Sequence, residues 1–105
     1  MTTMTHQPLD ARRVFGGVDT HKDVHVAGAL DELGRLWGTG SFPTTAGGYR
    51  QLWRWLRTDG DVVAVGVEGT GSWGAGLARC LTAQGVDVRE VMRPNRQHRR
   101  RDGKS

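Results

Sequence analysis

Residues 62–67 read Val-Val-Ala-Val-Gly-Val, so apolar side chains or glycine occupy both faces of any strand formed there. Such a run is typical of a central strand that helices cover on both sides. An acid, Glu68, follows it directly. A second apolar run, residues 14–18, likewise ends in an acid, Asp19. The sequence therefore predicts an α/β fold in which two buried strands each deliver a carboxylate at the carboxyl end.

The rest of the chain predicts the element order βββαβαβ. Two further β-rich runs, residues 24–30 and 35–42, flank a turn that ends in Gly34. After Pro43-Thr44-Thr45, helical spacing is shown by Tyr49, Leu52, Trp53 and Leu56. A second helix is predicted after a Ser72 N-cap and up to Gly85, from Trp73, Leu77, Cys80 and Leu81. Residues 86–91 alternate well enough for a fifth strand.

A chain of 105 residues holds one small domain. We expect a disordered leader at 1–13, a folded domain at 14–91 and a basic tail at 92–105 that leads to a missing carboxyl-terminal part. No apolar stretch is long enough for a membrane span, and the polar start lacks a signal-peptide pattern. These features predict a cytoplasmic protein without a membrane partner. The single cysteine, Cys80, excludes an internal disulfide and a multi-thiolate metal site.

The positive charge of the chain is concentrated in the tail. Residues 1–91 hold nine basic and ten acidic side chains, whereas residues 92–105 hold six basic side chains and one acid. A segment of this composition has almost nothing to bury and suits contact with a nucleic acid, or else serves as a solvated terminus. The candidate phosphate contacts are Arg93, Arg96, Arg99, Arg100, Arg101 and Lys104.

Three strands followed by α, β, α and β is the order of the ribonuclease H-like fold, which places the first strand beside the fourth. Asp19 and Glu68 would then lie together where α/β sheets usually bind ligands. Two carboxylates about 4 Å apart repel by roughly 4 kcal/mol at an effective dielectric constant near 20, so a divalent cation between them is favourable. The alternative is that both acids only cap turns or helix ends. Trp37 and Trp73 fit apolar patterns and are predicted to be core residues rather than base-stacking platforms.

Four segments carry a resemblance to a known family. They are Gly17-Val18-Asp19-Thr20-His21-Lys22, Phe42-Pro43-Thr44-Thr45 with Gly48-Tyr49, Val67-Glu68-Gly69-Thr70-Gly71-Ser72, and the Arg-rich segment that ends Gly103-Lys104-Ser105. In this order and spacing they resemble the amino-terminal, RuvC-like domain of the DEDD transposases of bacterial insertion sequences. The resemblance runs from about Val14 to Ser105.

The resemblance implies transposition by DNA strand cleavage and joining, with Mg²⁺ or Mn²⁺ held by four acids. Asp19 would be the first acid and Glu68 the second. It also implies a homo-oligomer and, in part of the family, a structured guide RNA. The third and fourth acids of the family follow the segment that matches Gly103-Lys104-Ser105, where this chain ends. We therefore expect an amino-terminal fragment, truncated before the last acidic helix, that binds metal weakly and does not cleave DNA alone.

Two other functions stay open at this stage. Gly17-Val18-Asp19-Thr20 also suits an actin-like ATPase or sugar-kinase fragment, although His21-Lys22 stand where that family has small residues. A non-catalytic nucleic-acid-binding module that uses only the tail is the second alternative. In the transposase interpretation, His21 and Lys22 are candidates for contact with a scissile phosphate or an RNA backbone; otherwise they are ordinary turn residues.

Overall fold

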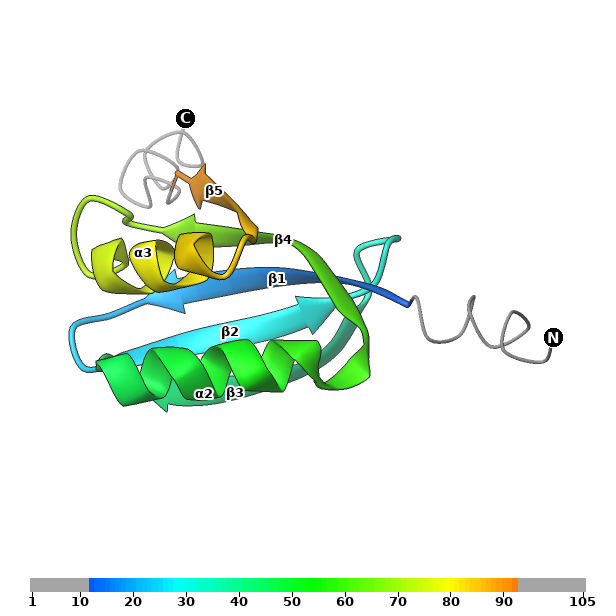
Figure 1. Cartoon of the computed structure of the whole chain (residues 1–105), viewed down its shortest axis with the longest axis horizontal. Helices are drawn as coiled ribbons and strands as arrows, with labels where there is room; N and C mark the ends of the chain where they lie inside the picture. The colour runs from blue at the N-terminus through cyan, green and yellow to red at the C-terminus, as the bar shows by residue number, and fades with distance from the viewer. Residues whose placement is uncertain (1–11, 93–105) are drawn as a thin grey trace, which may run out of the picture.

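The computed structural model describes residues 12–92, which form a five-stranded mixed sheet and two α-helices (Figure 1). The elements follow one another as β1 (Arg13–Thr20), β2 (Val24–Leu30), β3 (Leu36–Pro43), α2 (Ala46–Leu56), the short 3-10 helix η1 (Arg57–Asp59), β4 (Asp61–Glu68), α3 (Ala75–Ala83) and β5 (Asp87–Val91). The predicted order βββαβαβ is confirmed. The predicted leader and tail lie almost entirely outside the described residues, so those boundaries stay predictions.

The strands lie in the order β3-β2-β1-β4-β5. Strands β1, β2 and β3 form an antiparallel meander, whereas β4 is parallel to both β1 and β5. This places the first strand beside the fourth, as the ribonuclease H-like fold requires. Because β1, β4 and β5 are parallel, their carboxyl ends meet at one edge of the sheet. The predicted α/β, ribonuclease H-like class is confirmed.

Both helices pack on the same face of the sheet (Figure 1). That face holds the buried core, which combines alternate strand residues with the inner residues of α2 and α3: Val14, Val18, Ala27, Ala29, Leu52, Leu56, Val65, Val67, Leu77, Leu81 and Val86. Within residues 12–92 no helix covers the other face of β4, so the expectation of helices on both sides is not met there. On that face β4 carries Ala64 and Gly66, which need little cover.

The uncovered face is flat because glycines lie side by side across three strands. Gly17 of β1 pairs with Gly28 of β2 and with Gly66 of β4. Neighbouring apolar side chains fill the space above these glycines. A Cβ added at Gly28 would contact Leu36, and one added at Gly66 would overlap Val91. Phe15, Leu30 and Val26 lie on the same face, by their register with these residues. The middle of the face is therefore apolar, and by register Thr39 and Ser41 of β3 and Asp87 and Arg89 of β5 add polar side chains on either side of it.

Two tryptophans differ from the prediction. Trp37 is 39% exposed and Trp73 is 51% exposed, so neither is a core residue. Trp37 lies on the edge strand β3, where the guanidinium of Arg12 stacks over its ring at 5.1 Å. Trp73 precedes α3 because that helix begins at Ala75 with Gly74 as N-cap, two residues later than the Ser72 cap predicted. Trp73 therefore leaves the helical pattern, and Leu77 and Leu81 alone fill the core.

Candidate metal and nucleic-acid site

The two predicted acids meet at the carboxyl edge of the sheet. The parallel pairing of β1 with β4 runs through Gly17 with Gly66 and Val18 with Val67, and the next residues on the two strands are Asp19 and Glu68. Val18 and Val67 both face the helices, so the acids that follow them face the uncovered side. Since neighbouring strands lie about 4.8 Å apart, the register brings the two carboxylates onto one face as neighbours.

A hydrogen bond joins the two strand ends directly beneath the acids. Thr20 is buried, and its Oγ1 donates to the carbonyl oxygen of Glu68 at 2.9 Å. The chain then reverses at Gly69, which has a φ of +60° that favours glycine. The backbone of Glu68 is therefore held in place by its partner strand and by the turn that follows.

Asp19 has a histidine on its carboxylate. His21 Nε2 lies 3.1 Å from Asp19 Oδ2, and both side chains are about half exposed, at 46% and 47%. A proton on Nε2 donates to the carboxylate and orients it, while the exposure leaves the pair accessible to a ligand. The structure thus places His21 against Asp19. Its predicted contact with a phosphate or an RNA backbone stays untested.

The predicted basic contacts lie along the same edge, as far as the structure describes them. Lys22 is exposed in the turn between β1 and β2, next to His21. Strand β5 runs parallel to β4, and Val91 at its end pairs with Glu68. The six basic residues predicted in the tail, Arg93 to Lys104, lie outside the described residues. In sequence they follow Met92 immediately.

The donor set at this edge suits a hard cation. Two carboxylates supply oxygen ligands, and Mg²⁺ is commonly held by one or two carboxylates together with waters and substrate phosphate. Among residues 12–92 no group of three or more histidine, cysteine, aspartate or glutamate side chains is arranged to hold a metal. The two acids therefore fit a shared, partly hydrated ion and do not form a closed protein cage.

Comparison with known proteins agrees with this arrangement. The family model DEDD_Tnp_IS110, described as a transposase, matches residues 16–105. The chain belongs to this DEDD transposase family. A search of curated proteins finds no match. Membership supports a transposase role in the transposition of insertion sequences, and it implies DNA as a partner and the general use of a divalent metal. No helix in the described part of the chain is long and apolar enough to cross a membrane.

Sequence reasoning missed two features near this edge. His25 is fully buried on the helix-facing side of β2, and its ring stacks on Tyr49 with centroids 5.7 Å apart. Its parity with Ala27 and Ala29 in a predicted strand was a signal for this burial. The second feature is a pocket at the same strand ends, on the helix-facing side of the sheet, bordered by Trp73 and Glu90. No local sequence pattern predicts this pocket, because the residues that line it come from segments distant in sequence.

Proposed function

We propose that Asp19 and Glu68 are the first two metal-holding acids of a DEDD transposase that cleaves and joins DNA strands with Mg²⁺ or Mn²⁺. The observation that carries the proposal is the parallel register of β1 and β4, which sets the two carboxylates side by side on the uncovered face. Family membership supports the same reaction. The tail supplies phosphate contacts, and the homo-oligomer and guide RNA expected from the resemblance belong to this proposal.

Each residue at the edge has a distinct task in this proposal. Asp19 and Glu68 hold the ion, and His21 fixes the direction of the Asp19 carboxylate through its hydrogen bond. Lys22, exposed in the adjoining turn, meets a backbone phosphate. A divalent ion bound between the acids supplies Lewis-acid polarisation of a phosphate oxygen and activation of a water. The further ligands of a four-acid set lie outside residues 12–92.

Metal binding tests the acid pair directly. Asp19→Asn or Glu68→Gln is expected to lower the affinity of the chain for Mn²⁺ at least tenfold, because each removes a charged ligand from a site that has two. The measurement is Mn²⁺ titration followed by electron paramagnetic resonance. Asp61→Asn is the matched control, because Asp61 lies at the amino end of β4, at the other end of the strand from Glu68. This variant should bind Mn²⁺ as the wild type does. Equal losses in all three variants would contradict the assignment.

The same chain is expected not to nick supercoiled DNA, because two acids hold the ion too weakly for cleavage. The assay adds Mg²⁺ or Mn²⁺ to the purified 105-residue protein and follows conversion of plasmid to the open circular form. Metal-dependent nicking that disappears in Asp19→Ala would refute the expectation of inactivity, although it would support the assignment of the acid.

Salt dependence tests the tail. If its six cations contact duplex DNA, the logarithm of the binding constant falls against the logarithm of salt concentration with a slope of about −5, and of about −4 for single strands. Replacing Arg99 and Arg100 by glutamine should reduce the duplex slope by about 2. The matched control replaces Arg50 and Arg54, two exposed arginines of α2, and should leave the slope unchanged. A flat salt response of the wild type would rule out tail-mediated binding.

A further inference from the structure

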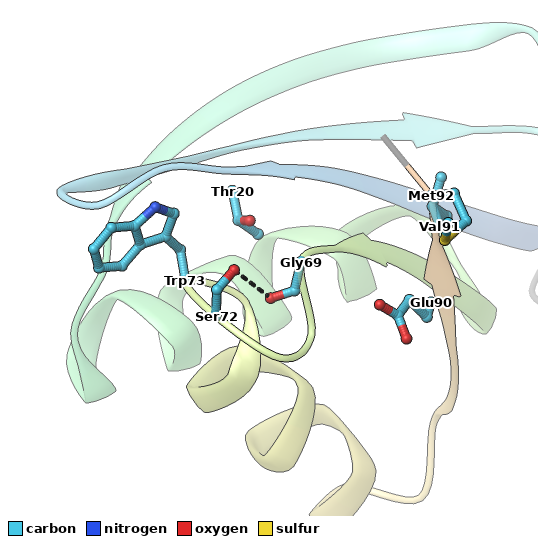
Figure 2. A pocket seen from close by; sticks show the side chains of 7 residues that line it. All are labelled: Thr20, Gly69, Ser72, Trp73, Glu90, Val91 and Met92. Carbon is cyan, nitrogen blue, oxygen red and sulfur yellow. Dashed lines mark hydrogen bonds between the residues drawn. The ribbon is translucent and has the colours of Figure 1, made fainter. Parts of the chain in front are cut away.

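A pocket of about 370 Å³ opens at the carboxyl ends of the parallel strands. Its residues Thr20 and Glu90 lie on the helix-facing side of the sheet, whereas Asp19 and Glu68 face the uncovered side. One wall is the turn between β4 and α3, with Ser72 and Trp73; the other is the end of β5, with Glu90 to Met92 (Figure 2). In Figure 2 the indole of Trp73 lies on one side of the pocket and the carboxylate of Glu90 on the other. The two walls are therefore chemically different.

Exposed apolar surface gathers around this pocket. Trp73 is 51% exposed, Val91 43% and Met92 83%, and these are three of the large apolar side chains left exposed in the described part of the chain. They come from two segments that only the fold brings together. An aromatic ring with apolar neighbours at the mouth of a pocket fits a flat apolar group, such as the face of a nucleobase.

The position of Trp73 is set by a hydrogen-bonded turn. The backbone N–H groups of Ser72 and Gly74 both donate to the carbonyl oxygen of Gly69, at 2.9 Å each. A side chain at Gly74 would overlap that of Val67 and the carbonyl of Glu68, so the turn packs tightly on the end of β4. Trp73 is thus presented from a fixed backbone and not from a loose loop. A rigid aromatic platform loses little entropy when a base stacks on it.

The polar side-chain groups of the pocket include a donor, the indole N–H of Trp73, as well as acceptors. The hydroxyl of Thr20 donates to Glu68 O at 2.9 Å and that of Ser72 donates to Gly69 O at 3.3 Å. Glu90 adds an exposed carboxylate. A ligand group that lies against the Glu90 carboxylate must donate a hydrogen bond, because an ionised carboxylate only accepts. Adenine and cytosine each carry an exocyclic amino group, and a glutamate that accepts from the N4 amino group of cytosine is a known mode of base recognition.

The pocket and the acid pair share their neighbours. Thr20 follows Asp19, Gly69 follows Glu68, and Val91 pairs with Glu68. We propose that this pocket binds one unpaired adenine or cytosine base, stacked on Trp73 with its amino group toward Glu90, at the strand ends that carry Asp19 and Glu68. This inference rests on the proposed function, because the acid pair is what brings a DNA strand to this edge.

The test uses fluorescein-labelled six-nucleotide strands of dA, dC or dT, measured by fluorescence anisotropy at one salt concentration in the presence of EDTA. The wild-type chain should bind dA and dC more tightly than dT. Trp73→Ala should weaken binding of dA at least fivefold, and Trp73→Phe should restore most of it. The matched control Trp37→Ala, an exposed tryptophan of β3, should bind as the wild type does. Glu90→Leu, which removes the acceptor, should remove the preference for dA and dC over dT.

Any of three results would overturn the proposal that the pocket binds a base. They are unchanged dA binding by Trp73→Ala, an equal loss in Trp37→Ala, and binding of dT as tightly as dA and dC. Two cross-checks keep this result apart from the acid pair. Trp73→Ala should retain wild-type affinity for Mn²⁺, and Asp19→Asn should not weaken dA binding in EDTA. If Mn²⁺ binding fails in the wild type while the Trp73 effect persists, the acid assignment is wrong and the base pocket stands.

Discussion

Gly48→Ala is expected to destabilise the fold by more than about 3 kcal/mol, although alanine is the better helix former. Gly48 is buried in the first turn of α2, and a Cβ there would overlap the carbonyl oxygen of Pro43. That oxygen belongs to the backbone at the end of β3, so relief requires α2 to move off the sheet. At about 4–8 °C per kcal/mol for a domain of this size, the melting temperature should fall by at least about 12 °C.

Gly47→Ala is the matched control and should have the opposite sign. A Cβ at Gly47 would lie 3.8 Å from Arg50 Nη2 and 4.0 Å from Thr45 Oγ1, both ordinary contacts. The substitution should therefore stabilise the chain by about 0.5–1 kcal/mol, through the lower flexibility of the unfolded state. Thermal unfolding followed by circular dichroism compares the two variants. Two shifts of the same sign would show that helix propensity, and not the approach to Pro43, controls this turn.

The protein is expected to lose stability as the pH falls below about 6.5, because His25 is buried in its neutral form. Thr44 Oγ1 donates to His21 O and lies 3.3 Å from His25 Nδ1, which assigns the proton of the neutral ring to Nδ1. Nε2 is buried and has no hydrogen-bond partner among the described residues. Burial lowers the pKa of His25, and the nearby His21 acts in the same direction.

The direction of this change in stability with pH follows from which state of the chain takes up a proton first. The unfolded chain takes up a proton at His25 near pH 6.5, whereas the folded chain does so only at lower pH, so acid favours the unfolded state by up to about 1.4 kcal/mol per pH unit between the two pKa values. Urea unfolding at pH 7.5, 6.5 and 5.5 measures the trend. His25→Phe, which can still stack on Tyr49, should flatten it, while His21→Gln should leave most of it. An unchanged trend in His25→Phe would assign the effect to another group.

Much of the fold was predictable because its signals are local. Residues 62–67 and 14–18 are buried strands whose acids follow directly, and Gly34 and Gly85 adopt positive φ where turns were predicted. Thr45 caps α2 through a hydrogen bond from the N–H of Gly48 to its Oγ1. Each of these features depends on a few neighbouring residues. The start of α3 was not predicted correctly, because the bonds to Gly69 O extend the turn beyond Ser72.

The candidate site likewise has features that the sequence predicted and features that it did not. Asp19 and Glu68 were predictable as a pair because parallel strands bring equivalent ends together, and one strand order makes them neighbours. The contact of His21 with Asp19, the pocket at Trp73 and the burial of His25 were not predicted. The pocket depends on segments that approach one another only in the folded chain, whereas the His21–Asp19 contact depends on the conformation of the turn after β1 and the burial of His25 on which face of β2 the helices cover.

Hydrophobic spacing and turn residues were therefore enough for the element order and for the edge at which the acids lie, since both follow from backbone periodicity and strand direction. Which face of the sheet the helices cover, why Gly48 but not Gly47 must be glycine, and where Trp73 points were decided by tertiary packing. These properties depend on distances between elements, and no pattern along the chain encodes such a distance.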